Sequence, residues 1–305
     1  MQKSFDCTIV VLSYNTREIT ESCLRRIALS AKNAQKALGA KTTTVVVDSA
    51  STDGSQTMVV TKFPSVRLVR LSKNKGPGPG YNAGMKLAKT PYILILNSDT
   101  YLAHDTLTKT LGHMQSHPDC DGLMCKKVDG TGQFEEYCGN IPTPARTIRW
   151  LLGMESLPIL RDHISRIYGY PDSAYKKAFR IGWMPTFFFL MKREVYTKTG
   201  GHDENIFLYM DDVEWFKRIE DAGFKIWYTP IATVVHLGGS STKKKNVGYH
   251  FLLANQVKSI AYMQKKHYPQ EWWLVSIFLF LGLKVRAITH LLMGHVVLAH
   301  AYWSV

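Results

Sequence analysis

Two polar motifs that contain carboxylates, each beside an apolar stretch, are the residues of this sequence best suited to chemistry. Asn97-Ser98-Asp99 follows the apolar run Tyr92–Leu96. A carboxylate such as Asp99 at the end of a central strand can hold a hard divalent cation that bridges two phosphates. Asp211-Asp212-Val213-Glu214 opens a helix-like run that ends at Gly223. Adjacent acids should raise one another's pKa, which suits a general base that takes a proton from an alcohol.

Three smaller polar groups also follow apolar strands. In Ser13-Tyr14-Asn15 the tyrosine can stack on a nucleobase. Asp48 ends the second strand, where it can accept a hydrogen bond from a base N–H or a ribose hydroxyl. His236 follows another strand and is a candidate metal ligand. Each group has a plainer alternative, a turn without a ligand, and acids at a helix N-terminus are favoured by the helix dipole alone.

The segment Asn74–Gly84 carries glycine at nearly every second position, among them Gly76 and Gly78, and also contains Asn82. Glycine lets the backbone approach a ligand closely or adopt unusual dihedral angles. The segment is similar to a phosphate cradle, but it has neither the P-loop spacing nor the dinucleotide fingerprint. A phosphate site and a purely structural loop both remain open for it.

The elements that must position these residues alternate along the first half of the chain. Strands that are apolar on both faces and alternate with helices predict a parallel sheet covered by helices, and such sheets bind ligands at the carboxyl ends of their strands. The expected strands are Thr8–Leu12, Thr42–Val47, Val66–Leu71 and Tyr92–Leu96, and the expected helices are Glu18–Leu38, Ser55–Thr61 and Asn82–Ala88. Arg146–Ile181 is less regular and is either an elaboration packed on the sheet or a lid over the acceptor.

The bulk composition narrows the class of protein. The 305 residues are 45% hydrophobic and carry a formal net charge of +14, which favours partners with phosphate or anionic lipid. The excess charge lacks the aromatic-basic stripe of a nucleic-acid binder, so we expect no nucleic-acid partner. Five scattered cysteines indicate reduced thiols, and we expect no signal peptide at the N-terminus.

The C-terminal part differs in composition from the rest. Phe251–Lys266 predicts an amphipathic helix. The apolar run Trp272–Leu283, stopped by Lys284 and Arg286, spans roughly 18 Å as a helix, whereas a bilayer core needs about 30 Å. With a second run at Leu291–Trp303, this pattern favours helices that lie in a membrane interface over helices packed on the domain. Lys243–Lys245 is either a cationic loop that closes over a diphosphate or a solvated charge run.

Taken together, these motifs resemble the family-2-type inverting glycosyltransferases of the GT-A fold, and within them the bacterial rhamnosyltransferases. The resemblance covers roughly Thr8 to Thr242. The matching motifs are Ile9–Asn15, Asp48, the series Asn74, Gly76, Gly78, Gly80, Asn82 and Gly84, then Asn97-Ser98-Asp99, Gly200–Glu204, Tyr209–Glu214 and His236 with Gly239–Ser241.

The resemblance implies a GT-A-type α/β domain over residues 1–242, with a mostly parallel sheet, and a C-terminal helical membrane-associating region over 243–305. It implies that Asp48 contacts the nucleobase, that Asp99 binds Mg²⁺ or Mn²⁺, and that Asp212 is the catalytic general base. The donor site would comprise Ser13, Tyr14, Asn15, Asp48, Gly76, Gly78, Asn82 and Ser98. The implied reaction moves rhamnose from dTDP-rhamnose to a polyprenyl-diphosphate-linked sugar at the cytoplasmic membrane face, in cell-surface polysaccharide synthesis.

Departures from the family pattern keep alternatives open. Asn97 replaces the first acid of the metal motif, and Asp211-Asp212 replaces the usual Glu-Asp pair, so the base is either of the two. A polyprenyl-phosphate sugar transferase would differ only in its acceptor. A nucleotidyltransferase also uses a strand-end metal, and a catalytically silent carbohydrate- or lipid-binding module is the remaining alternative.

Overall fold

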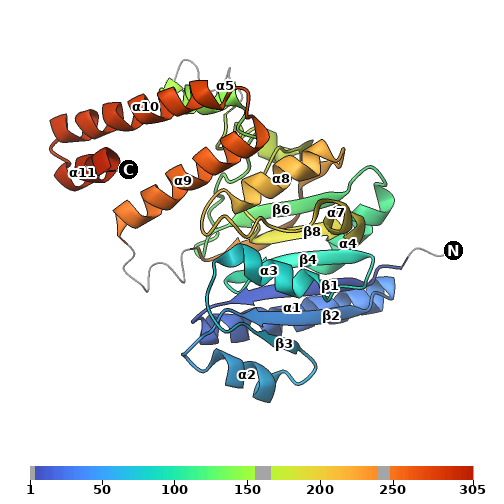
Figure 1. Cartoon of the computed structure of the whole chain (residues 1–305). Coiled ribbons are helices and arrows are strands. Elements are labelled where there is room, and N and C mark those ends of the chain that lie inside the picture. The colour runs from blue at the N-terminus through green and yellow to red at the C-terminus, as the bar shows by residue number, and fades with distance from the viewer. Residues whose placement is uncertain (1–3, 155–165, 239–247, 305) are drawn as a thin grey trace.

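The computed structural model describes residues 4–154, 166–238 and 248–304. The chain alternates strands and helices through its first half and ends in three helices (Figure 1). The strands are β1 Cys7–Ser13, β2 Thr42–Asp48, β3 Arg67–Arg70, β4 Tyr92–Asn97, β5 Thr100–Leu102, β6 Gly122–Val128, β7 Phe179–Arg180, β8 Phe188–Lys192 and β9 Ile226–His236. The helices are α1 Arg17–Leu38, α2 Ser55–Lys62, α3 Pro77–Met85, α4 Thr106–Ser116, α5 Pro144–Leu151, η2 Ala174–Lys176, α7 Arg193–Thr199, α8 Asp211–Asp221, α9 Tyr249–His267, α10 Trp272–Leu292 and α11 Val296–Ser304.

One sheet runs through the molecule in the order β3-β2-β1-β4-β8-β6-β9-β5, with β7 added to β9. The strands from β3 to β4 pair in parallel, as the apolar runs predicted. Beyond β4 the sheet is mixed, because β8 runs antiparallel to both of its neighbours while β6 and β9 are parallel to each other. The register pairs Ser13 with Asp48 and Leu12 with Asn97, so three strands end at one edge of the sheet.

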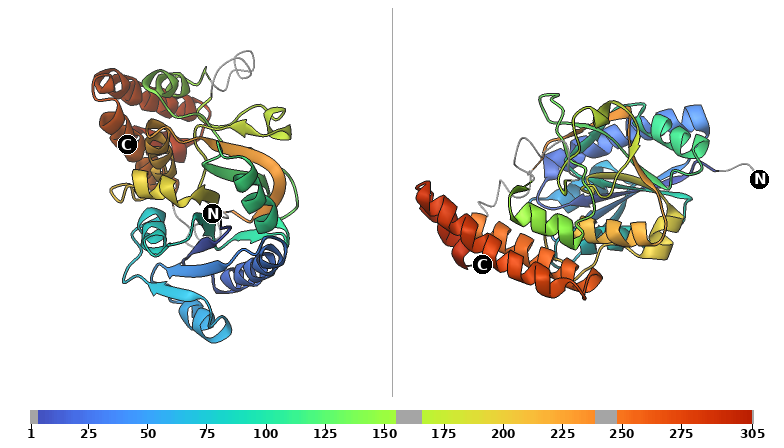
Figure 2. Two further views of the ribbon diagram at one scale, coloured as in Figure 1. Left: turned by 90° about the vertical axis from the view of Figure 1, so that its right-hand side faces the viewer. Right: turned by 90° about the horizontal axis from the view of Figure 1, so that it is seen from above.

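Helices cover both faces of the sheet, as Figure 2 shows from the side. Helices α1 and α4 pack on one face, and α3, α7 and α8 lie on the other. The core between these layers is built from strand side chains that are fully buried, such as Ile9, Leu94 and Phe189. Phe189 of β8 packs against Trp215 and Phe216 of α8, which fixes the acidic helix to the middle of the sheet.

The glycine-rich segment is helical, which corrects the expected helix Asn82–Ala88. Helix α3 begins at Pro77, directly after Gly76, and ends at Met85. Proline is well suited to the first helical position because its missing N–H has no partner there and its φ is already helical. Gly80 and Gly84 face β1: a β-carbon at Gly84 would lie 2.3 Å from Val10 Cγ1. These glycines therefore allow a helix to pack closely on the sheet.

The C-terminal helices α9, α10 and α11 pack on one another and extend away from the sheet (Figures 1 and 2). Helix α9 agrees with the amphipathic helix predicted at Phe251–Lys266. The helix that contains the next apolar run is longer than the roughly 18 Å expected from Trp272–Leu283, because α10 continues past Lys284 and Arg286 to Leu292. Both cations are accommodated by the protein: Lys284 Nζ donates to the Trp303 carbonyl and Arg286 Nη2 to the Trp150 carbonyl.

Helix α10 has 21 residues, so its length of about 31 Å would suffice to cross a bilayer core. Its side chains at Val275, Leu279 and Leu283 are buried against protein. The opposite side is exposed: Phe280 and Leu292 are 61% and 84% accessible to solvent. A helix with one face committed to protein and one apolar face in water is consistent with the interfacial arrangement that the sequence favours.

The irregular segment Arg146–Ile181 contributes α5, η2 and β7 within its described part. Helix α5 packs against α10, where Gly282 faces Leu151. Tyr168 lies between Trp150 and Trp183, with ring centroids at 5.9 and 5.5 Å. This segment therefore joins the sheet to the C-terminal helices. The expected cationic loop Lys243–Lys245 and the motif residues Gly239–Ser241 lie outside the described residues.

Candidate active site

The ends of β1, β2 and β4 bring the predicted donor residues together at one edge of the sheet. Ser13 is buried and its hydroxyl lies 3.0 Å from that of Thr20. Thr16 bridges two strand ends, because its hydroxyl lies 3.4 Å from Ser13 and 3.0 Å from Ser98. Ser13 and Ser98 therefore belong to a buried hydroxyl network that supports the strand ends. Tyr14 follows Ser13 and is half-buried.

Asp48 is fully buried at the end of β2 and is only partly satisfied. Its Oδ1 accepts from the Ser51 backbone N–H at 2.8 Å and from the Gln56 side-chain amide at 2.7 Å. Its Oδ2 is buried and has no hydrogen-bond partner among the described residues. An unsatisfied buried acceptor is costly, so it favours a ligand donor at this position, such as a base N–H.

Asn15 links the loops after β1 and β2. Its φ is +52°, in the left-handed region that asparagine tolerates better than most residues. The side-chain oxygen accepts from the Thr52 backbone N–H at 2.8 Å, and the Asn15 N–H donates to Ser51 Oγ at 2.9 Å. Asn15 therefore supports the loops that carry Tyr14 and Asp48.

The two predicted metal ligands meet although 137 positions separate them in the sequence. Thr100 pairs with His236 across β5 and β9, which brings His236 beside the end of β4. Asp99 Oδ1 lies 3.3 Å from His236 Nε2. The His236 ring stacks on Phe187 with centroids 4.6 Å apart, and its Nδ1 is buried without a partner among the described residues.

This pair fits a cation that is shared with a substrate. The described residues contain no cluster of three or more His, Cys, Asp or Glu side chains able to enclose a metal. Mg²⁺ is usually bound through one or two carboxylates together with substrate phosphates and water. Asp99 and His236 thus provide a partial donor set that a diphosphate can complete.

Gly76, Gly78 and Asn82 connect the donor side to the acidic block. Gly76 has φ +95°, and a β-carbon there would lie 2.2 Å from the Phe207 carbonyl oxygen. A β-carbon at Gly78 would lie 2.9 Å from His202 Cβ. Asn82 accepts from the His202 N–H and donates to the His202 carbonyl. The structure thus gives these residues a packing role, and their contact with phosphate remains a prediction.

The acidic block begins at a strained turn. Tyr209 and Met210 both have positive φ, +62° and +63°, directly before α8. Non-glycine residues in this region cost of order 1–3 kcal/mol each and occur mostly where the surrounding structure fixes them, often at functional sites. The turn brings Asp211 and Asp212 into the first turn of α8.

The two neighbouring aspartates have different surroundings. Asp211 is buried, and its Oδ2 lies 3.1 Å from His202 Nδ1. Asp212 is half-buried, and its Oδ1 accepts from the Val213 backbone N–H at 2.8 Å. Burial and the adjacent Asp211 carboxylate raise the pKa of Asp212 well above its ordinary value. Asp212 is therefore the acid of this pair better suited to receive a proton.

The pKa of Glu214 is not raised in the way that the repulsion expected among the three neighbouring acids would predict. It is fully buried, which by itself raises the pKa, but hydrogen bonds from His267, Arg218 and Lys266 outweigh burial and hold the pKa well below its usual range. A carboxylate so stabilised in its ionised form is a poor proton acceptor. The expectation that all three acids raise one another's pKa is correct for Asp212 and wrong for Glu214.

Sequence reasoning missed Tyr81 and the role of His202. Tyr81 is buried, donates to Asn97 Oδ1 and stacks on His202 at 5.4 Å. Burial and the negative charges of Asp99, Asp211 and Asp212 raise its pKa well above the usual value. Tyr81 therefore lies within electrostatic reach of both the candidate metal site and the acidic pair. No spacing in the sequence signals this, because its neighbours come from three separate segments.

Comparison with known proteins finds relatives among the glycosyltransferases. The model of the family "Glycosyl transferase family 2" matches residues 8–200. N-acetylglucosaminyl-diphospho-decaprenol L-rhamnosyltransferase of Mycobacterium tuberculosis is 22% identical over 288 residues, covering 87% of this chain and 85% of that protein. Rhamnosyltransferase WbbL of Escherichia coli is 24% identical over 151 residues, covering 49% of this chain and 53% of that protein.

Among solved structures, the mannosyltransferase PcManGT of Pyrobaculum calidifontis, in complex with GDP-Man and Mn²⁺, superposes with a TM-score of 0.56. It is 18% identical, and the match covers 98% of this chain and 74% of the other. At this level of identity the likeness shows a shared fold.

Proposed function

The chain belongs to glycosyl transferase family 2, and from that premise we propose that it transfers a sugar with inversion from a nucleoside-diphosphate donor to a lipid-linked sugar. The single observation that carries this proposal is that three groups are linked beside the strand ends: the unsatisfied Asp48 oxygen, the Asp99–His236 pair and the high-pKa Asp212. Thr16 connects the ends of β1 and β4, Ser13 pairs with Asp48, and the charges of Asp99 and Asp212 both act on Tyr81.

Each group has a role in the proposed reaction. Asp48 accepts a hydrogen bond from the nucleobase of the donor, and Tyr14 stacks on that nucleobase. Asp212 takes the proton from the acceptor hydroxyl, whose oxygen forms a bond to the anomeric carbon as the bond to the diphosphate breaks. A Mg²⁺ or Mn²⁺ ion on Asp99 and His236 would neutralise charge on the departing diphosphate.

The relatives support the choice of substrates. The mycobacterial relative is named for transfer of L-rhamnose to N-acetylglucosaminyl-diphospho-decaprenol, and the Escherichia coli relative is a rhamnosyltransferase. We therefore propose rhamnose from dTDP-rhamnose as the donated sugar and a polyprenyl-diphosphate-linked sugar as the acceptor, in the synthesis of a cell-surface polysaccharide. A polyprenyl phosphate remains the alternative acceptor.

The C-terminal helices support a place at the cytoplasmic face of the membrane. Their exposed side includes large apolar side chains in an almost continuous series, at Trp273, Ile277, Phe280, Leu281, Val285, Ile288, Leu291, Leu292, Met293, Val296, Val297 and Trp303. Contiguous exposed apolar surface typically marks a protein or membrane interaction site. Together with the +14 net charge, it favours an anionic lipid surface, where a prenyl-linked acceptor would also lie.

The deciding experiment incubates the protein with a panel of nucleotide sugars and a short prenyl-diphosphate-linked N-acetylglucosamine, with Mn²⁺, with Mg²⁺ or with EDTA. Products are identified by mass spectrometry. We expect transfer from dTDP-rhamnose with either metal, loss with EDTA, and a fall of about 10²- to 10⁴-fold in Asp212→Asn, the usual contribution of a general base. Donor binding without transfer to any acceptor would instead support a silent binding module, and release of pyrophosphate would indicate a nucleotidyltransferase.

A further inference from the structure

Glu214 is held by hydrogen-bond donors from two helices. Arg218, one turn further along α8, donates through Nε at 3.0 Å and Nη2 at 2.8 Å. Lys266 and His267, in the last turn of α9, lie 2.8 and 3.0 Å from Glu214 Oε1. We call Glu214, Arg218, Lys266, His267 and Asp203 the Glu214 cluster. Leaving a buried carboxylate unpaired is strongly destabilising, so the end of α9 and the start of α8 are held together.

The same end of α9 also contacts the loop that precedes α8. Lys266 Nζ lies 2.6 Å from Asp203 Oδ2, and the Tyr262 hydroxyl donates to the same oxygen at 2.8 Å. Ser259 Oγ donates to the Leu208 carbonyl at 3.2 Å. Helix α9 therefore contacts the acidic block at both sides of the strained turn.

Asp212, the proposed general base, lies between these contacts along the chain. Asp212 is two residues before Glu214 in the first turn of α8, and it follows the left-handed pair Tyr209–Met210. A turn in sparsely populated dihedral angles keeps its shape only when its surroundings over-determine it. In the described chain, those surroundings include the Ser259 contact with Leu208 before the turn and the Glu214 cluster after it, and α9 contributes to both.

We propose that Lys266 and His267 are positioning residues that hold the Asp212 carboxylate toward the acceptor through Glu214. Helix α9 is then part of the catalytic unit as well as the connection to the apolar helices α10 and α11. The inference rests on the proposed function in one respect, the assignment of Asp212 as the base.

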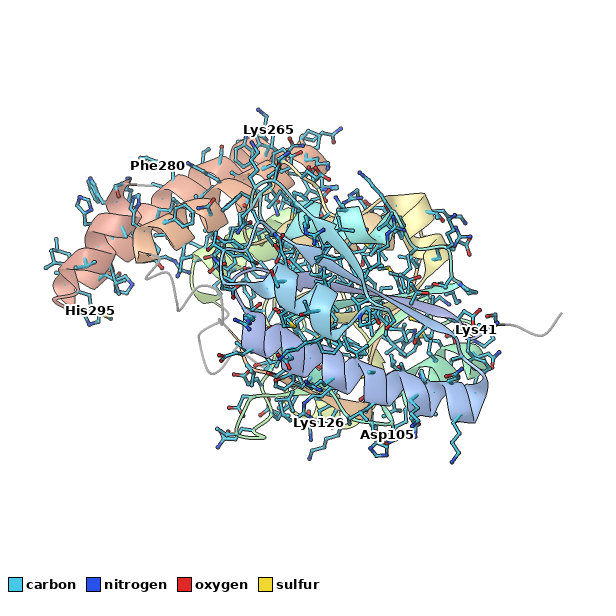
Figure 3. All side chains as sticks on the ribbon, turned by 90° about the horizontal axis from the view of Figure 1, so that it is seen from below. Lys41, Asp105, Lys126, Lys265, Phe280 and His295 are labelled. Carbon is cyan, nitrogen blue, oxygen red and sulfur yellow. The ribbon has the colours of Figure 1, made fainter. Side chains whose placement is uncertain are left out.

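Two neighbouring lysines give a matched test. Lys266→Met removes the link to Glu214 and Asp203, whereas Lys265→Met removes an exposed charge of the same kind from the same turn (Figure 3). A misplacement of about 1 Å can cost about 10²-fold in rate. We expect kcat of Lys266→Met to fall about 10- to 100-fold with the donor KM within about twofold of wild type. Lys266→Arg should restore most of the rate, and Lys265→Met should match wild type.

The outcomes separate this inference from the proposed function. If the wild-type protein transfers no sugar, the proposed function is wrong. If the wild type is active and Lys266→Met equals Lys265→Met, the positioning role is wrong. A loss of donor binding in Lys266→Met, or no rescue by Lys266→Arg, would also overturn it. Should Lys266→Met not fold, His267→Gln carries the same test, with the same expected fall in kcat at constant donor KM.

Discussion

At the scale of single residues, the surroundings divide one acidic motif into three roles. Asp211 contacts His202, Asp212 is left half-buried with a raised pKa, and hydrogen bonds from His267, Arg218 and Lys266 lower the pKa of Glu214. The difference comes from neighbours, since all three side chains are carboxylates within one helical turn. Asp212 is accordingly the proposed base, and Asp211 is the charge that raises its pKa.

This division predicts a pH profile. A base must be deprotonated to act, so the raised pKa of Asp212 places the acidic limb of kcat/KM above the ordinary aspartate value of about 3.9. Asp211→Asn removes one of the two causes of that rise, so the limb should move to lower pH while transfer persists. The measurement is kcat/KM for transfer between pH 4 and pH 9 on both proteins. An acidic limb that stays in place, or moves to higher pH, would contradict the claim that the Asp211 charge raises the pKa of Asp212.

At the scale of elements, close packing of α3 on the sheet decides where the acidic block and the donor residues meet. Gly80 and Gly84 bring the helix against β1, and Gly76 and Gly78 leave room for Phe207 and His202. Glycine in a helix normally costs roughly 0.5–1 kcal/mol relative to alanine. Here that cost is offset by the close contact between α3 and β1, which a side chain at either glycine would prevent.

Gly84→Ala should therefore destabilise the protein. The new β-carbon would lie 2.3 Å from Val10 and 3.0 Å from Val47, both buried β-branched side chains of the sheet. We expect the free energy of unfolding to fall by about 1–3 kcal/mol, the usual cost of overpacking. Gly112→Ala is the matched control, because nothing lies within 4 Å of its β-carbon and α4 should gain roughly 0.5–1 kcal/mol. Denaturant unfolding followed by circular dichroism measures both, and equal effects at the two positions would refute the packing argument.

At the scale of the whole molecule, the sheet domain and the C-terminal helices form one connected structure with two surfaces. The first carries Asp48 and Asp99 at the strand ends and Asp212 in the first turn of α8. The second is the exposed apolar side of α10 and α11, on which Figure 3 labels Phe280. Helix α9 connects them through the Glu214 cluster. The proposed boundary between residues 1–242 and 243–305 stays a prediction, and the contacts of α9 argue for treating that helix together with the first part.

The second surface predicts binding to lipid. Phe280→Ser with Leu292→Ser should weaken binding to vesicles of anionic phospholipid by about tenfold or more, because burying each such side chain contributes about 1.5–3 kcal/mol. Leu29→Ser is the control, since Leu29 is 61% exposed, like Phe280, but lies on α1. Vesicle flotation measures the affinity. Equal binding by the double variant and the control would remove the support for a membrane surface.

The sequence by itself determined the parallel half of the sheet and the edge at which polar residues collect. Runs such as Tyr92–Leu96 are apolar on both faces, and strands of that kind are stable only between two layers of helices. Because parallel strands end at the same edge, Ser13, Asp48 and Asp99 could be placed together from the sequence alone. The meeting of Asp99 with His236 was also predictable, but only through the family resemblance.

Only the tertiary structure decided which of the neighbouring acids has a raised pKa and how the C-terminal helices join the sheet domain. The neighbours that lower the pKa of Glu214 include His267, 53 positions away, and no local pattern encodes such a contact. The glycine-rich helix α3 packs Gly80 against Leu12 and Gly84 against Val10 and Val47, and this packing overrides the low helix propensity of glycine. Likewise, the partner of Lys284 in α10 is the Trp303 carbonyl of α11, 19 positions away. Long-range contacts, made only once the chain is folded, supply the free energy in each case.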